Sequence, residues 1–105
     1  SIQLVRAVYV MSECFPKSEL YGLTSQMRRA AVSIPSNIAE GYKRKGRLEF
    51  LQFLSIAEAS AAELETQVII AKELYPTIQY EPIEQLLEEV QKILVVFIRK
   101  LNAKR

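Results

Sequence analysis

Four long segments carry apolar residues at alternating intervals of three and four positions, and this spacing constrains the fold more than any other feature. It places the apolar side chains along one face of an α-helix. Prolines mark the limits of the pattern, because Pro16 and Pro76 stop two segments and Pro82 lies where the last one begins. The four stripes are Leu4, Val8, Met11 and Phe15; Leu20, Leu23, Met27, Ala30, Ile34 and Ile38; Phe50, Leu54, Ala57, Ala61, Leu64, Val68, Ala71 and Tyr75; and Ile83, Leu87, Val90, Leu94, Phe97 and Leu101.

The spacing predicts a single all-α domain over residues 1–105, an up-down-up-down antiparallel four-helix bundle. Connections near residues 15–18, 42–47 and 75–81 are short, so successive helices should be antiparallel neighbours. A proline ring removes a backbone hydrogen bond and crowds the preceding turn, so Pro35 should bend the second helix. The expected bounds are a first helix that ends near Cys14, a second from about Ser18 to Gly41, a third with Gly46 as N-cap and Glu49 at N3 that ends before Pro76, and a fourth with Pro82 at N1.

The composition excludes several classes of function. The chain is 50% hydrophobic and 25% charged, which is typical of one soluble domain, and no apolar run approaches the roughly 18 residues of a membrane span. With no signal-peptide pattern at its start, we expect a cytoplasmic protein. The chain has no histidine and a single cysteine, Cys14, which excludes His-dependent catalysis and the usual zinc and di-iron sites. We therefore expect no enzyme activity, no cofactor and no metal.

The third and fourth segments carry more apolar residues than one stripe needs. A monomeric bundle has to cover one face of each helix, so the surplus favours a homo-oligomer, with a broad core as the alternative. The residues outside the stripes are Phe53, Ile56, Ile70, Leu74, Val95, Val96 and Ile98.

Polar residues interrupt the apolar pattern of the second and third segments. Ser33, Asn37 and Glu40 follow one another at helical spacing, and Arg29 lies one turn before Ser33. A buried charge needs a partner, so we expect these four residues to be largely buried and to bond with a carboxylate of the third helix. The carboxylates in question are Glu58 and Glu63. We interpret the cluster as structural, fixing helix register, and not as catalytic.

Positive charge is concentrated in one part of the chain. Residues 16–50 hold seven basic and three acidic residues, whereas the rest holds seven basic and nine acidic residues. The turn after the second helix, here called the basic turn, carries Lys43, Arg44, Lys45 and Arg47. Such a cluster attracts phosphate and predicts RNA or DNA binding. The alternative is an oligomeric scaffold or adaptor, in which the turn is only solvated and the acidic residues from Glu81 onward contact a protein partner.

Residues 15–74 closely resemble the four-helix-bundle proteins of the 23S rRNA-intervening sequence protein family. The resemblance rests on the run RRAAVSIPSNIAEG, the following EF and the block AEASAAELETQ. It implies a small bacterial protein that assembles as a ring-like homopentamer. Similar bundles are accessory proteins of diversity-generating retroelements, so RNA, DNA, a reverse transcriptase or another protein are the partners that it implies. Residues usual before the first helix are absent, so we expect further residues upstream of Ser1.

Overall fold

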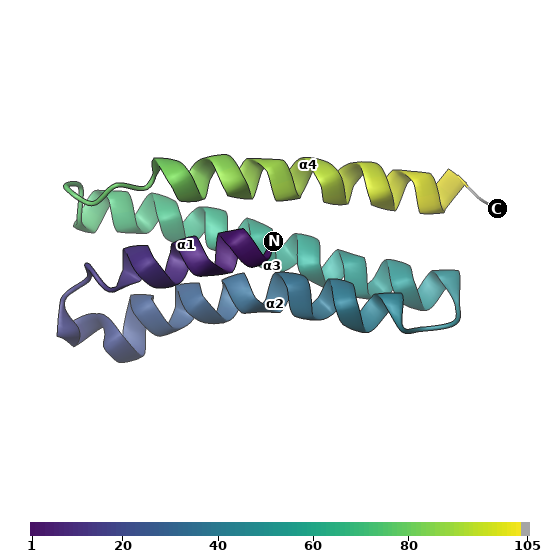
Figure 1. Cartoon of the computed structure of the whole chain (residues 1–105), viewed down its shortest axis with the longest axis horizontal. Coiled ribbons are helices and arrows are strands. Elements are labelled where there is room, and N and C mark those ends of the chain that lie inside the picture. Colours follow the sequence, from purple (N-terminus) through teal and green to yellow (C-terminus); the bar gives the residue numbers. More distant parts are fainter. Residues whose placement is uncertain (104–105) are drawn as a thin grey trace.

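The computed structural model describes residues 1–103, which form four α-helices that alternate in direction along one long axis (Figure 1). These are α1 (Ile2–Ser12), α2 (Ser25–Tyr42), α3 (Arg47–Leu74) and α4 (Glu81–Ala103). Each helix packs on the next along the chain, and α1 also contacts α4. The described residues contain no strand. The predicted antiparallel four-helix bundle is confirmed.

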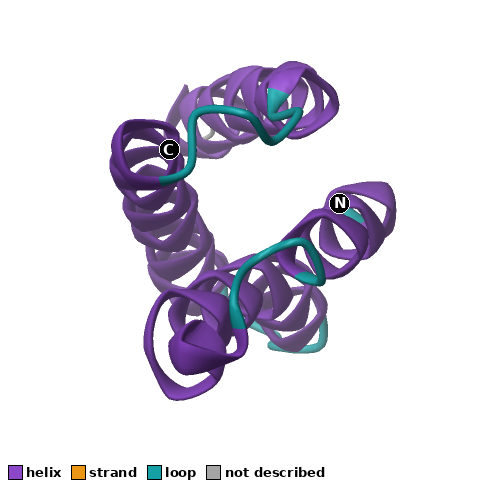
Figure 2. Ribbon diagram, turned by 90° about the vertical axis from the view of Figure 1, so that its left-hand side faces the viewer, coloured by secondary structure: helices purple, strands orange, loops and turns teal. Residues whose placement is uncertain are grey.

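The apolar stripes form the core, as the sequence predicts. Seen along the bundle, the helices surround the core as an open C, with α1 and α4 at its two ends (Figure 2). The largest side chains that are fully buried come from all four helices: Leu4, Val8, Met27, Ile34, Leu54, Leu64, Ile83 and Leu94. No helix within residues 1–103 is long and apolar enough to cross a membrane.

The second segment differs from the prediction at its start, because α2 begins at Ser25 and not near Ser18. A 3₁₀ turn (Lys17–Glu19) and a π-helical turn (Leu20–Thr24) precede it, with non-helical backbone angles at Gly22. The Glu19 carboxylate accepts a hydrogen bond from the Leu23 N–H at 3.2 Å, which holds this turn in place. As a result Leu20, a predicted stripe residue, is 50% exposed.

A hydrogen bond links this turn to the far end of α3. The Tyr75 hydroxyl donates to Glu19 Oε2 at 2.6 Å, and its ring lies 5.3 Å from that of Phe15. The bond lowers the pKa of the Glu19 carboxyl and raises the pKa of the Tyr75 hydroxyl from their ordinary values. The corner between α1 and α2 is therefore fastened to the end of α3.

The helix α2 remains continuous through Pro35, and the bend expected at this residue stays a prediction. α2 and α3 share the most extensive contact between any two helices. Gly41 shows how closely they approach, because a Cβ atom there would lie 2.7 Å from Cβ of Phe53 and 2.9 Å from Cδ1 of Phe50. A glycine at this position allows the end of α2 to lie against the first turns of α3.

An apolar opening remains between α1 and α4. The side chains of α1 and the connection before α4 line a cavity of about 590 Å³, with Val10, Met11, Ile78 and Pro82 in its wall. The helix α4 exposes further apolar residues: Ile93, Val95, Val96 and Phe97. Part of the surplus expected from the sequence is exposed in a single chain, namely Ile56, Ile70, Leu74, Val95 and Val96, whereas Phe53 is half-buried and Ile98 packs against the core.

We predict that Gly41→Ala lowers the free energy of unfolding by about 1–3 kcal/mol, because its methyl group would force α2 and α3 apart. This loss should exceed the gain of about 1 kcal/mol that alanine has over glycine in a helix. Gly46→Ala is the matched control, since its Cβ would lie 3.7 Å from the nearest atom, an ordinary contact. Urea denaturation measures both variants, and a Gly41→Ala variant as stable as the parent would contradict this packing.

Candidate nucleic-acid interface

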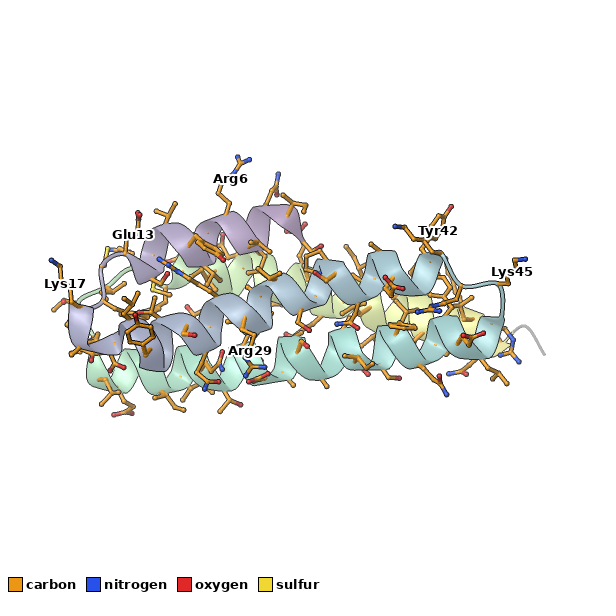
Figure 3. The ribbon with its side chains drawn as sticks, turned by 90° about the horizontal axis from the view of Figure 1, so that it is seen from below. Arg6, Glu13, Lys17, Arg29, Tyr42 and Lys45 are labelled. Atoms are coloured by element: carbon orange, nitrogen blue, oxygen red, sulfur yellow. The ribbon has the colours of Figure 1, made fainter. Side chains whose placement is uncertain are left out.

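The basic turn lies where three helix ends meet. Lys43 follows the last residue of α2, Gly46 is the N-cap of α3, and α4 ends at the same end of the molecule (Figure 1). Arg47 joins α3 to α4 by donating from Nη1 to the Leu101 carbonyl oxygen at 3.1 Å. Lys45 extends from this end of the bundle into solvent, with Tyr42 nearby (Figure 3).

The four cations of the turn are not equivalent. Arg44 forms an ion pair with Glu40 at 2.9 Å, and its guanidinium lies 5.0 Å from the centre of the Phe53 ring. Arg47 is partly buried against α4. Lys43 and Lys45 are exposed, and neither forms an ion pair with any residue among 1–103. The two lysines are therefore the cations best placed to bind a phosphate.

Two further features contribute positive charge near the basic turn, and the sequence of the turn alone does not predict them. The fold brings Arg99 and Lys100 of α4 to the same end as the basic turn, although they are more than fifty residues away in sequence. The N-cap Gly46 offers no side chain to the first N–H groups of α3. Such groups carry partial positive charge and attract anions, so they add to the field of the lysines.

Charge is divided unequally along the bundle. The end formed by residues 36–56 and 94–103, here called the basic end, holds six basic and two acidic residues. The remainder of the described chain, residues 1–35 and 57–93, holds six basic and ten acidic residues. The modest net charge of +2 thus conceals a basic end and a more acidic remainder. A polyanion would be attracted to one end of the molecule.

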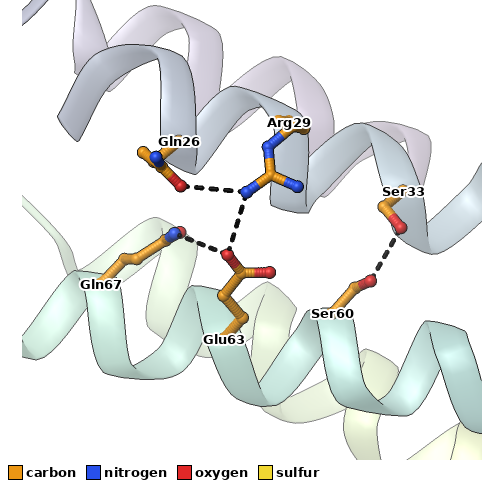
Figure 4. Close-up of polar contacts among 6 residues, drawn as sticks. All are labelled: Gln26, Arg29, Ser33, Ser60, Glu63 and Gln67. Atoms are coloured by element: carbon orange, nitrogen blue, oxygen red, sulfur yellow. Dashed lines mark hydrogen bonds and ion pairs between the residues drawn. The ribbon is translucent and has the colours of Figure 1, made fainter. Parts of the chain in front are cut away.

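Part of the predicted polar cluster lies between α2 and α3, where Ser33 of α2 faces Ser60 of α3 (Figure 4). The hydroxyl groups of Ser33 and Ser60 form a hydrogen bond of 2.7 Å between the helices. Asn37 donates from Nδ2 to the Ser33 carbonyl oxygen at 2.8 Å and to its hydroxyl at 3.0 Å. Because Ser60 is small and buried, the two helices can approach closely enough for this direct contact.

The expected contact between Arg29 and a carboxylate of α3 is present, but it is not buried. Arg29 Nη2 lies 3.3 Å from Glu63 Oε2, and the two side chains are 66% and 41% exposed. Gln26 accepts from the same arginine at 3.0 Å, and Gln67 donates to Glu63 at 3.3 Å (Figure 4). The pair lies at the edge of the helix contact, where long side chains reach water.

Two further residues of the predicted cluster lie outside this network. Glu40 is exposed and pairs with Arg44, and Glu58 is exposed on α3. The expectation that Arg29 and Glu40 are buried is therefore wrong, and Glu40 has its partner on the α2 side of the turn, Arg44, and not on α3. The small residues that close the contact between α2 and α3 leave no space for charged groups inside it.

Comparisons with known proteins bear on the chain as a whole. A sequence model of the family described as 23S rRNA-intervening sequence protein matches residues 1–96. No curated protein matches the chain.

Among the residues that the structure describes, no group of three or more His, Cys, Asp or Glu side chains is placed to hold a metal ion.

We predict that a double-mutant cycle on Arg29 and Glu63 gives a coupling energy of about 0.2–1 kcal/mol, because exposed ion pairs are worth little. This coupling should fall as salt is raised. The matched control is a cycle on Ser33 and Ser60, whose coupling joins neutral groups and should not respond to salt. Urea denaturation of the alanine variants measures both cycles, and a salt-independent coupling of about 3–5 kcal/mol at Arg29 and Glu63 would indicate a buried network instead.

Proposed function

Because the chain belongs to the 23S rRNA-intervening sequence protein family, we propose that it is a non-enzymatic homopentamer that binds RNA or DNA through its basic end. The observation that carries the proposal is the unequal division of charge along the bundle, with six basic and two acidic residues at one end. A binding protein of this kind needs no acid–base pair or metal, which agrees with a chain that has no histidine.

The basic end is suited to the phosphate backbone and not to the bases. Lys43 and Lys45 are flexible cations on an exposed turn, and the first N–H groups of α3 lie beside them. A turn of this kind does not lie in a groove and read base edges as a recognition helix does. Binding should therefore show little sequence preference and should depend strongly on salt.

The exposed apolar residues of α3 and α4 support self-association. Ile56, Ile70 and Val96 are each close to half exposed in one chain, although they lie on helices that also contribute to the core. Covering such residues with a second copy removes apolar surface from water. A ring would also repeat the basic end, so contacts that are weak singly would act together on one polymer.

We predict that light scattering at micromolar concentration gives about five times the chain mass of 12.0 kDa. Val95→Lys with Val96→Lys should lower this mass, since two charges would enter the proposed interface. Ile2→Lys, which changes an exposed apolar residue of α1 outside the surplus set, is the matched control and should leave the mass unchanged. A parent protein that remains monomeric refutes the oligomer.

We predict that Lys43→Gln with Lys45→Gln weakens binding to single-stranded RNA and DNA without changing the oligomer. The slope of log affinity against log salt should become shallower by about 0.7 for each phosphate that the variant no longer neutralises. Arg47 is left intact, because it also holds the end of α4. Arg6→Gln with Lys17→Gln removes the same charge from exposed positions outside the basic end and is the matched control. If the parent protein retards no nucleic acid at low salt, the protein is a scaffold and the proposal fails.

A further inference from the structure

A second surface, away from the basic turn, combines aromatic rings with arginines. Where the end of α1 meets the start of α2, the surface is hollowed into an open groove of about 490 Å³. We call it the tyrosine–arginine groove, after the residues that line it: Tyr9, Tyr21, Arg28 and Arg29, with Val32 and Leu20 beside them. It shares no residue with the basic turn or with the exposed apolar face of α4.

The guanidinium of Arg28 is held flat in this groove. It lies over the ring of Tyr9, with 4.6 Å between Cζ and the ring centre. Its Nε donates to the Ser12 hydroxyl at 2.8 Å, and Nη2 lies 3.5 Å from the Tyr9 carbonyl oxygen. These contacts attach α2 to the end of α1 and hold the Arg28 guanidinium beside the Tyr9 ring.

Tyr21 also lines the groove and is 92% exposed. The π-helical turn Leu20–Thr24, which the helical spacing did not predict, carries its ring outward instead of into the core. An aromatic ring so exposed gains nothing from packing in the single chain. Arg29, with a side chain 66% exposed, supplies a cation beside it, although Glu63 offsets part of that charge.

We propose that the tyrosine–arginine groove binds an unpaired base of a single-stranded nucleic acid. Single strands are recognised through bases that stack on aromatic rings and on arginine planes, and the groove presents both. A base within a duplex is already stacked and paired, so duplex should not enter the groove. The proposal rests on the proposed function and adds to it a preference for unpaired strands.

The position of the groove allows one strand to reach the basic turn as well. Arg29, Ser36 and Lys43 follow at intervals of seven residues, so they lie on one side of α2, and all three are exposed. The distance along α2 from Arg29 to Lys43 is about 21 Å at 1.5 Å per residue. Single-strand binding domains cover about 4–16 nucleotides, which is enough to span both sites.

The test compares three probes of equal length by fluorescence anisotropy at low salt: an oligothymidine single strand, the same strand without bases, and a blunt duplex. Tyr21→Ala should weaken binding of the oligothymidine roughly tenfold and leave binding of the other two unchanged. Tyr21→Phe keeps the ring and should bind as the parent does. Tyr21→Leu keeps an apolar side chain without the ring and should behave like Tyr21→Ala.

Several outcomes would overturn the groove as a base site. These are a Tyr21→Leu variant that binds like the parent, an equal weakening of binding to the strand without bases, or an oligomer that dissociates in Tyr21→Ala. Because Tyr21 is almost fully exposed, its replacement should not disturb folding. If the parent binds all probes and Tyr21→Ala changes none, the groove proposal alone fails. If the parent binds no probe, the proposed function fails as well.

Discussion

The close contact between α2 and α3 is the interaction on which the rest of the structure depends. Gly41 permits it at one end, and the hydrogen bond between Ser33 and Ser60 crosses it near the middle. Alanines are frequent among the buried residues of both helices and let the helix axes lie near one another, so α1 can pack on α2 and α4 on α3. The same contact determines where the basic turn lies, because the chain that leaves α2 after Tyr42 enters α3 at Arg47.

Side chains from other segments of the chain donate hydrogen bonds to carbonyl groups at three of the helix ends. These residues therefore have a structural role, although their side chains are of the kinds that also bind ligands. Arg28 contacts the end of α1, the Tyr80 hydroxyl donates to carbonyl oxygens at the end of α3, and Arg47 donates to one at the end of α4. The carbonyl groups at the end of a helix lack some of the partners that those within it have, so each contact adds a hydrogen bond where the helix itself supplies fewer. Within residues 1–103, neither Lys43 nor Lys45 forms an ion pair, which separates them chemically from the arginines of the same region.

The helical spacing of apolar residues was enough to predict the bundle, its connections and most of its core. It failed at Leu20, because the turn there depends on the Glu19 carboxylate and on backbone angles at Gly22 that no periodic pattern encodes. The spacing also placed Arg29 and Glu40 on a polar face without showing whether that face reaches water. The contribution of Arg99 to the basic end required the fold, since only the packing of α4 on α3 brings it there.

The symmetry of the proposed ring determines where the basic ends of its chains lie relative to one another. Rotation about a cyclic axis gives every basic end the same height along the axis and the same distance from it, so the basic ends form one circle in the assembly. A polyanion would meet this circle of basic turns, and a strand held by several of them would pass near the tyrosine–arginine grooves only where it leaves the circle along α2. Phosphate attraction at the end of the bundle would therefore precede base stacking along its side.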